Sequence, residues 1–270
     1  MRAALIQIKI AYGEPQKNIE KISSYVDKCM SSEKKPDVII LPEMWNTSFA
    51  LPEIELIADQ EGYPAAESVR KLACKHRVNI VAGSVADKRK GKIYNTCYVF
   101  DRKGQTIARY DKVHLFSLMN EPAYITPGGK RALFKLDGIL CGVIICYDVR
   151  FPELSRAYAM EGAQILFVPA QFPHPRYNPW MHLVPARAIE NQMYVVGVNR
   201  IGKENNAEFF GRSMVVEPKG DIVICGTENK EEILIADLDP SKVKESREYM
   251  RCLEERREDV YKNNKKKNHP

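Results

Sequence analysis

Short apolar segments alternate with longer amphipathic segments along most of the chain, and this alternation limits the fold more than any other feature. Residues 37–41 read Asp-Val-Ile-Ile-Leu between two prolines, which is typical of a strand buried on both faces of a sheet. Such a rhythm of strands and helices predicts an α/β fold. Strands are expected at 3–8, 37–41, 79–84, 139–145, 164–168 and 194–198, and helices at 16–30, 65–76, 152–161 and 180–192.

Turn signals add antiparallel strands to this pattern. Lys103-Gly104 joins apolar runs at 94–101 and 105–110, and Lys219-Gly220 lies between runs at 209–216 and 221–224. Further strands are expected at 132–136 and 233–237. The sheet geometry is therefore expected to be mixed.

Length and charge bear on domain organisation. The 270 residues, 44% of them hydrophobic, suit one large domain, which we place at residues 1–255. Four of the lysines behind the net charge of +6 lie at 262 and 265–267, within a basic segment at 256–270. We expect this segment to be a disordered tail rather than a nucleic-acid-binding arm.

Apolar runs and cysteines bear on location. Each apolar run is too short for a membrane span, and the first residues resemble a strand rather than a signal peptide. The seven cysteines are odd in number and form no Cys-x-x-Cys pair, which indicates free thiols in a reducing compartment. A cytoplasmic protein that does not bind membranes is expected.

Three polar residues follow predicted strands directly. Glu43 comes after Val38–Pro42, Lys112 after Thr106–Tyr110, and Cys146 after Gly142–Ile145. In open α/β sheets, sites form in crevices at the carboxyl ends of strands, so these side chains are expected to converge.

A carboxylate, an ammonium and a thiol together suit covalent hydrolysis of an amide. Glu43 would accept the thiol proton, Cys146 would attack the carbonyl, and Lys112 with the Tyr147 N–H would stabilise the oxyanion. Glu43 would then protonate the leaving amine and activate the water that hydrolyses the thioester. A helix after Cys146 would favour the thiolate through its positive end.

Each of these residues also has an ordinary structural explanation when taken alone. A cysteine that ends an apolar strand commonly fills a core, a glutamate can cap a helix, and a lysine can end a strand in solvent. Composition alone leaves Cys-His catalysis open, since His114, His174 and His182 are present. No zinc motif, P-loop or G-x-G-x-x-G motif occurs, so we expect neither metal nor cofactor.

Taken together, three segments resemble the signature motifs of the nitrilase (carbon-nitrogen hydrolase) superfamily. They are LPEMW at 41–45, YDKVHLF at 110–116 and ICYDVRFPEL at 145–154, in the family's order. Segments 186–192, 211–213 and 218–220 are similar to further family segments. The resemblance implies a four-layer α-β-β-α sandwich that forms a homodimer, with Glu43 as base, Lys112 as stabiliser and Cys146 as nucleophile. It also implies a second glutamate, which Glu121 matches.

Within the superfamily the chain looks most like the omega-amidase branch, whose substrates are 2-oxoglutaramate and 2-oxosuccinamate. The segment QFPHPR at 171–176 carries this likeness, and Arg176 would bind the far carboxylate of an anionic substrate through paired hydrogen bonds. Phe116, Tyr147 and Phe172 are expected to line the pocket. Family motifs often carry Arg or Lys where this chain has Asp111.

Two alternatives remain at this point. Another amidase of the superfamily would act on deaminated glutathione, an N-carbamoyl amine or an aliphatic amide, because the catalytic set is shared. A non-catalytic dimeric binding module would keep the sandwich and lose the chemistry, although the intact Glu43, Lys112 and Cys146 favour an enzyme.

Overall fold

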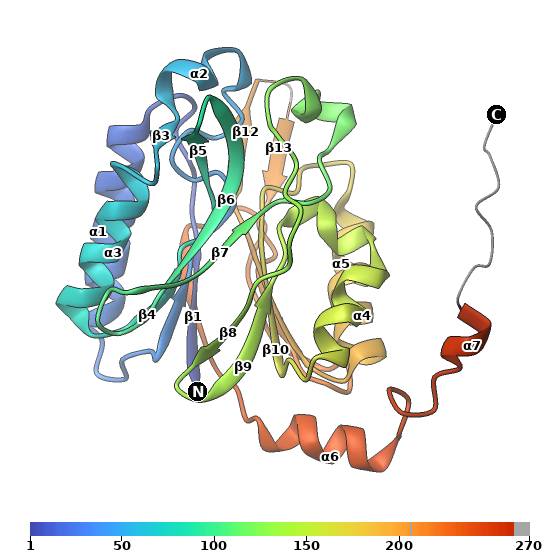
Figure 1. Cartoon of the computed structure of the whole chain (residues 1–270). Coiled ribbons are helices and arrows are strands. Elements are labelled where there is room, and N and C mark those ends of the chain that lie inside the picture. The colour runs from blue at the N-terminus through green and yellow to red at the C-terminus, as the bar shows by residue number, and fades with distance from the viewer. Residues whose placement is uncertain (206, 262–270) are drawn as a thin grey trace, which may run out of the picture.

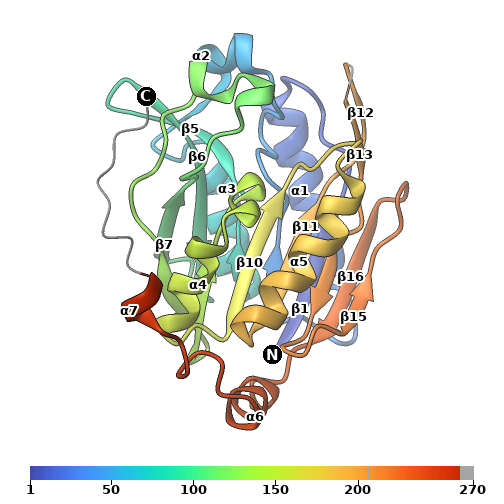
Figure 2. The same cartoon turned by 90° about the vertical axis from the view of Figure 1, so that its right-hand side faces the viewer.

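A computed structural model describes residues 1–205 and 207–261. Two sheets lie face to face, and each carries a pair of helices on its outer face, so that the layers run α-β-β-α (Figure 1). Helices α1 (Pro15–Met30) and α3 (Ala65–His76) cover one sheet, and α4 (Pro152–Met160) and α5 (Tyr177–Asn191) cover the other (Figures 1 and 2). The four-layer sandwich expected from the sequence is confirmed.

The first sheet has eight strands in the described part of the chain, in the order β16-β1-β2-β4-β6-β5-β3 with β7 beside β6. Its centre is parallel, since β1, β2 and β4 run the same way, while β16 and β6 run against them. The strands are β1 (Arg2–Gln7), β2 (Val38–Ile40), β3 (Asp59–Gln60), β4 (Asn79–Val81), β5 (Val85–Arg89), β6 (Lys92–Phe100), β7 (Thr106–Asp111) and β16 (Glu232–Asp237).

The second sheet has the order β15-β14-β11-β10-β9-β8 among the described residues. Its centre is again parallel, at β9, β10 and β11. Parallel strands end at the same edge, so the carboxyl ends of both sheet centres lie at the upper side in Figure 1. The strands are β8 (Leu133–Leu136), β9 (Ile139–Val143), β10 (Ile165–Ala170), β11 (Tyr194–Asn199), β14 (Met214–Val216) and β15 (Ile222–Cys225).

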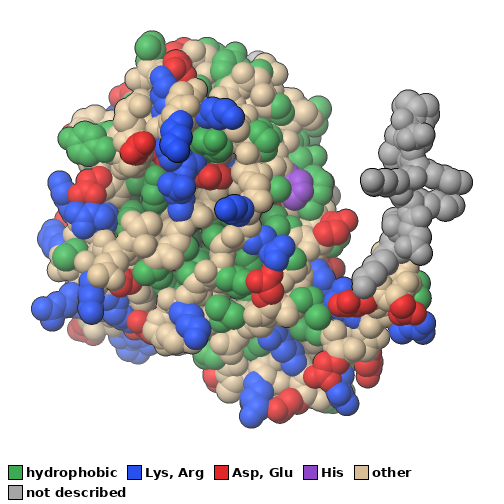
Figure 3. All heavy atoms as spheres, viewed as in Figure 1, with side chains coloured by type: hydrophobic (Ala, Val, Ile, Leu, Met, Phe, Trp, Pro, Cys, Tyr) green, Lys and Arg blue, Asp and Glu red, His purple; other side chains and the backbone are tan. Residues whose placement is uncertain are grey.

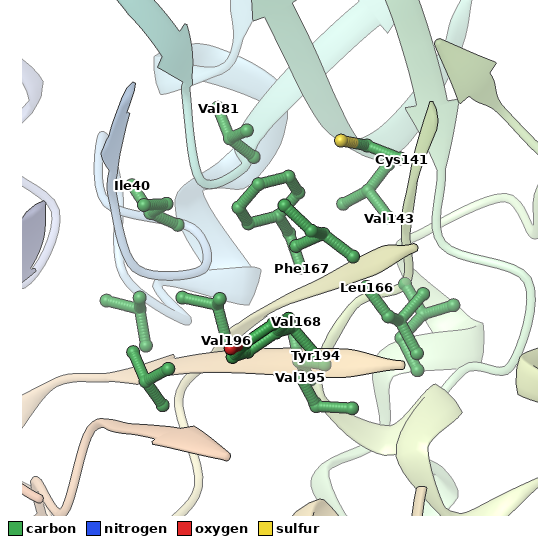
Figure 4. Close-up of a cluster of buried hydrophobic side chains, with 14 of the residues drawn as sticks. Ile40, Val81, Cys141, Val143, Leu166, Phe167, Val168, Tyr194, Val195 and Val196 are labelled. Atoms are coloured by element: carbon green, nitrogen blue, oxygen red, sulfur yellow. The ribbon is translucent and has the colours of Figure 1, made fainter. Parts of the chain in front are cut away.

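Period-two alternation divides the first sheet between two hydrophobic layers. Leu5 on β1 belongs to the core between the sheets, whereas its neighbours Ala4 and Ile6 pack in the cluster under α1 and α3. In the core between the sheets, Ile40 and Val81 approach Phe167 (Figure 4). Both faces are buried, which explains why the sequence of these strands is almost purely apolar.

Small residues let the outer helices approach the second sheet. A Cβ on Gly142 of β9 would lie 2.6 Å from the Tyr158 ring of α4. A Cβ on Gly197 of β11 would lie 2.9 Å from Trp180 of α5. The close contact of α4 and α5 with this sheet therefore depends on glycine.

The observed strands differ from the predicted ones at several places. Strand β5 was missed, because its Asp-Lys-Arg ending hides the apolar signal. The run 209–216 forms two strands, β13 (Ala207–Phe210) and β14, because Gly211 and Arg212 between them adopt positive φ angles of 64° and 56°. Strand β13 pairs with β12 (Ile201–Glu204) in a separate hairpin, which continues from the upper end of β11 in Figure 2.

The C-terminal segment extends beyond the sandwich. Helix α6 (Ser241–Tyr249) lies below the sheets in Figure 1, and a short helix α7 (Glu258–Tyr261) follows. The first residues of the expected tail, 256–270, thus include a helical turn, and residues 262–270 lie outside the described residues. The domain limit at 255 remains a prediction.

The surface mixes charges of both signs. On the face shown in Figure 3, Lys and Arg side chains lie interspersed with Asp and Glu. Among the described residues, no helix is both long and apolar enough to cross a membrane.

Candidate active site

Glu43, Lys112 and Cys146 meet at the upper edge of the sandwich, as the strand-end argument predicted. Lys112 Nζ lies 2.9 Å from Glu43 Oε1. The three residues are buried, with exposed fractions of 0% for Glu43, 1% for Lys112 and 8% for Cys146. Strand ends from both sheets therefore contribute to a single polar cluster.

Glu121 joins this cluster from a loop. The residue begins the short 3-10 turn η3 (Glu121–Ala123), whose other residues are exposed, yet Glu121 is fully buried. Its carboxylate oxygens lie 2.9 and 3.0 Å from Lys112 Nζ, and Oε2 accepts a hydrogen bond of 2.7 Å from the Phe116 N–H. Lys112 thus bridges two carboxylates, and Glu121 anchors its loop over the site.

Glu43 is held by the loop that follows β4. Ser84 contacts the residues on either side of Glu43. Its Oγ accepts a hydrogen bond of 2.9 Å from the Met44 N–H, and its own N–H donates to the Pro42 carbonyl at 3.1 Å. Gly83 has φ of 58°, and a Cβ there would lie 2.0 Å from Pro42 O. Glycine at 83 is therefore required for the two loops to approach, and this approach fixes the backbone on both sides of Glu43.

Two residues that sequence reasoning missed also hold Glu43. Asn95 on β6 donates to Glu43 Oε1 at 2.9 Å and to Glu121 Oε1 at 3.3 Å. The backbone N–H of Gln171 donates to Glu43 Oε2 at 2.8 Å. Gln171 directly follows β10, so the rule that singled out Glu43 and Cys146 could have found it.

Burial and charge shift the pKa values of the cluster. Burial raises the pKa of Glu43, although the Lys112 ammonium opposes the rise. For Lys112, burial acts to lower the pKa, but the Glu121 and Glu43 carboxylates outweigh it and raise the pKa well above its usual value. Lys112 is accordingly a fixed positive charge at neutral pH, and Glu43 is a carboxylate with increased proton affinity.

The thiol of Cys146 differs from the prediction. Burial, followed by the Glu43 carboxylate, raises the pKa of Cys146 well above its ordinary value, with Lys112 acting against them. The expectation that the thiolate would be favoured was wrong, because burial outweighs the groups that lower the pKa. The residues after Cys146 form a short 3-10 turn, η4 (Cys146–Arg150), before α4 begins. The resting cysteine is a neutral thiol, so a base must remove its proton.

The turn at Cys146 is conformationally unusual. Cys146 has φ of 46°, a left-handed value that a non-glycine residue adopts at a cost of order 1–3 kcal/mol. The buried Asp148 carboxylate stabilises the turn by accepting hydrogen bonds from the Ile145 N–H at 2.9 Å and from the His114 N–H at 2.9 Å. The strain is therefore held by a network that also fixes the chain just after Lys112.

A pocket opens at Cys146 and contains all four expected substrate-binding residues, Phe116, Tyr147, Phe172 and Arg176. The guanidinium of Arg176 lies 4.8 Å from the centre of the Phe116 ring. Arg150, which sequence reasoning did not assign, lines the same pocket, and its guanidinium lies 5.7 Å from the Phe172 ring centre. Within residues 1–205 and 207–261, neither arginine has a carboxylate within ion-pair distance.

The histidine alternative receives no support from the geometry. His114 Nδ1 lies 2.8 Å from Asp148, His182 Nδ1 lies 2.6 Å from the Asn178 carbonyl, and His174 stacks on Tyr177. Among the residues that the structure describes, no group of three or more His, Cys, Asp or Glu side chains is arranged to hold a metal ion. Glu43 is the carboxylate that lies beside the thiol.

Comparisons with known proteins show the family of the chain. The family model "Carbon-nitrogen hydrolase" matches residues 2–248. The chain is 40% identical to a 2-oxoglutaramate amidase of Bacillus subtilis, over 95% of this chain and 97% of the relative. It is 30% identical to the omega-amidase NIT2 of Homo sapiens, over 96% of each. A solved amidase from Nesterenkonia sp. AN1, with the acetamide moiety of fluoroacetamide added covalently at its active-site cysteine, has a TM-score of 0.85 and 26% identity, covering 98% of this chain and 97% of that one.

Proposed function

The chain belongs to the carbon-nitrogen hydrolase family, and we propose that it is an omega-amidase that hydrolyses 2-oxoglutaramate or 2-oxosuccinamate to the 2-oxo dicarboxylate and ammonia. Its membership in the family confirms the resemblance found in three motifs, and it makes the chain an enzyme rather than a non-catalytic binding module. Cysteine-dependent amide hydrolysis is the chemistry that the site presents.

In the proposed mechanism, Glu43 takes the proton of the Cys146 thiol as sulfur attacks the amide carbonyl. The oxyanion is stabilised by Lys112 and the Tyr147 N–H. Glu43 then gives its proton to the departing ammonia, which leaves an acyl thioester. A water molecule, deprotonated by Glu43, hydrolyses the thioester and restores the thiol. The raised pKa of Glu43 suits both proton transfers, and Glu121 orients Lys112.

The two guanidinium groups in the pocket carry the choice of substrate. Arg176 and Arg150 line the same cavity as Cys146, and both stack against aromatic rings, which keeps their N–H groups free for a ligand. Guanidinium groups bind carboxylates through paired hydrogen bonds, so the pocket suits an amide with a carboxylate at its far end. The name of the Bacillus subtilis relative supports the same substrate.

Ammonia release from 2-oxoglutaramate tests the proposal. The comparison panel contains glutamine, deaminated glutathione, an N-carbamoyl amine and a small aliphatic amide, with Cys146→Ala as the blank. We expect 2-oxoglutaramate to have the highest kcat/KM, and Arg176→Met to raise its KM by roughly 10–100-fold, equivalent to about 1.5–3 kcal/mol for a charged hydrogen bond. Arg176→Met should leave turnover of the neutral aliphatic amide within about twofold.

Other amidases of the family remain the alternative, because they would share Glu43, Lys112 and Cys146. Turnover confined to deaminated glutathione, an N-carbamoyl amine or an aliphatic amide would keep the mechanism and reject the substrate. Equal effects of Arg176→Met on anionic and neutral amides would also reject it, since the arginine would then not select a carboxylate.

The homodimer that the resemblance implies is part of the proposal. Exposed apolar side chains on the elements of the second sheet and its helices support it: Met160 at the end of α4, Ile189 on α5, and Ile222 with Val223 on β15. Light scattering of the purified chain, compared with an Ile189→Glu variant, tests this interface.

A further inference from the structure

Gln171 controls the position of Glu43 at two points. Its backbone N–H donates to the Glu43 carboxylate at 2.8 Å, and its side-chain Nε2 donates to the Glu43 carbonyl at 2.6 Å and to the Met44 carbonyl at 3.2 Å. The same backbone N–H faces the Cys146 sulfur and acts to lower the pKa of the thiol. The placement of Gln171 therefore decides how the carboxylate and the sulfur meet.

Arg200, between β11 and β12, fixes the side-chain amide of Gln171. Its Nη1 lies 3.2 Å from Gln171 Oε1. The Ser48 hydroxyl oxygen also lies 3.2 Å from this atom, and its single proton is shared between Gln171 Oε1 and the nearer Glu204 Oε2. With the oxygen held by donors, the amide nitrogen must point at the carbonyls of Glu43 and Met44. If the Gln171 amide were flipped, its NH2 group would face the Arg200 guanidinium. Both groups are hydrogen-bond donors, so the flipped orientation is unfavourable.

Arg200 is itself rigidly held and cut off from solvent. It is 1% exposed, the Phe209 ring centre lies 4.3 Å from its guanidinium, and Nη1 also donates to Glu204 at 2.6 Å and to Ser48 at 2.7 Å. Nη2 donates to the Ile10 carbonyl at 2.9 Å. A buried ion pair of this kind adds little to stability compared with apolar residues, so a geometric task accounts for it better.

We propose that Arg200 is a positioning residue of the active site, which orients the Gln171 amide and thereby places Glu43 against Cys146. Among the described residues it donates no hydrogen bond to Glu43 or Cys146, so it acts only through Gln171. This inference rests on the roles given to Glu43 and Cys146 in the proposed function.

The first test compares Arg200→Met and Arg200→Lys with the wild type. Because a misplacement of about 1 Å can cost about 10²-fold, we expect Arg200→Met to lower kcat by roughly 10–100-fold with KM within about twofold. The acidic limb of the kcat/KM profile should move to higher pH, because Glu43 loses support for its charged form while Lys112 and Glu121 remain in place. Arg200→Lys should recover part of both effects.

A double variant tests the route through Gln171. If Arg200 acts through the amide, Arg200→Met combined with Gln171→Met should be no slower than Gln171→Met alone. Multiplied effects would overturn the proposal. So would a folded Arg200→Met enzyme with wild-type kcat, or one with lowered kcat and an unmoved acidic limb, which would indicate a merely structural role.

Alkylation of Cys146 separates this inference from the choice of substrate. Iodoacetamide labelling, followed by mass spectrometry of the Cys146 peptide, needs no substrate, so it remains informative if 2-oxoglutaramate is not turned over. Arg200→Met should slow labelling at pH 7 and raise its pH midpoint, and unchanged labelling would overturn the proposal. If Arg200→Met does not fold, Glu204→Gln replaces it, with a several-fold loss of kcat and the same shift expected. Arg102→Gln is the control, because it removes an arginine that binds Asp37 and Asp137 rather than Gln171. It should leave kcat and the labelling of Cys146 unchanged.

Discussion

The protein buries two pairs of carboxylates, Glu43 with Glu121 and Asp59 with Asp87, and they differ in what surrounds them. All four residues have exposed fractions of 0%. Glu43 and Glu121 share the ammonium of Lys112 and lie beside a thiol and a pocket. In this pair, the ammonium of Lys112 is the shared counterion of both carboxylates.

The second pair combines main-chain donors with side-chain partners, among them Arg89, whose Nε lies 3.2 Å from Asp87 Oδ2. Asp59 Oδ2 accepts the N–H groups of Ala65 and Ala66 at 2.9 and 3.0 Å, at the start of α3. Asp87 accepts the Gly62 N–H at 2.8 Å and the Tyr98 hydroxyl at 2.7 Å. These carboxylates therefore join loops and the start of a helix to the sheet.

The comparison shows that a raised pKa does not by itself identify a catalytic group. Burial raises the pKa of Glu43, and burial also raises the pKa of Asp59, to about 6. Only Glu43 faces Cys146. We therefore expect the first pair to govern turnover and the second to govern stability, and the following variants test that division.

Glu43→Gln should have the largest effect. It keeps the size of the side chain and removes the base, so kcat should fall by about 10³–10⁴-fold, in the upper range for general acid-base catalysis. Lys112 keeps Glu121 as its counterion, so the melting temperature should stay within a few degrees. Ammonia release measures kcat, and thermal unfolding measures the melting temperature. A variant that retains a tenth of the wild-type kcat would show that Glu43 is not the base.

Lys112→Met should affect turnover and stability together. Removing the cation leaves two buried carboxylates without a counterion, which should cost about 3–5 kcal/mol of unfolding free energy at pH 8, besides abolishing turnover. The pKa of Glu43, which the Lys112 ammonium holds down, then rises further, so protonation should restore stability as the pH falls. Urea unfolding at pH 8 and pH 5.5 measures this, and an equal loss at both would contradict the interpretation.

Asp59→Asn should have a smaller effect, which depends on pH and leaves turnover unchanged. The pKa of Asp59 rises from 3.8 to about 6 on folding, so its contribution to stability is complete below about pH 4 and is lost as the pH rises through about 6. The unfolding free energy of the wild type should therefore fall relative to the variant by about 1–3 kcal/mol between pH 4 and pH 7. Urea unfolding of both proteins at several pH values measures this. A difference in unfolding free energy between wild type and variant that is the same at pH 4 and pH 7 would show that the pKa shift is absent.

Arg102→Gln should have the smallest effect. Arg102 binds Asp37 and Asp137 outside both pairs and is 38% exposed. Exposed ion pairs contribute about 0.2–1 kcal/mol, so unfolding free energy should change within that range and kcat should not change. A larger loss would mean that ion pairs outside the two buried pairs also sustain the fold.

The sequence predicted the framework and the reactive trio for the same physical reason. Apolar strands had to be buried, buried parallel strands end together, and Glu43 and Cys146 follow such strands. Lys112 follows β7, which is only partly buried and ends at the same edge because it runs antiparallel to β6, as β4 does. Asn95 was missed because it lies within β6 rather than after a strand, and only the folded sheet brings it to Glu43. Arg200 was missed because its partners, Gln171 and Ser48, are distant in sequence and meet only in the folded sheet edge.

Local conformation accounts for the remaining errors. The Gly211-Arg212 break is invisible to hydrophobic periodicity, since Phe209–Val216 remains mostly apolar across it. The thiolate prediction failed because a strand-to-helix pattern does not reveal how deeply Cys146 is buried. Burial then decides the protonation state of Cys146, and burial depth is a tertiary property.

The pairing of β1 with β16 has a consequence for synthesis on the ribosome. Strand β1 ends at Gln7, and the strand that completes its outer edge begins at Glu232. At about 5–20 residues per second, that edge waits roughly 10–45 s for its partner. During this interval an apolar strand with unpaired N–H and C=O groups is open to other chains. We therefore expect nascent chains that stall before Glu232 to be the species most in need of a chaperone.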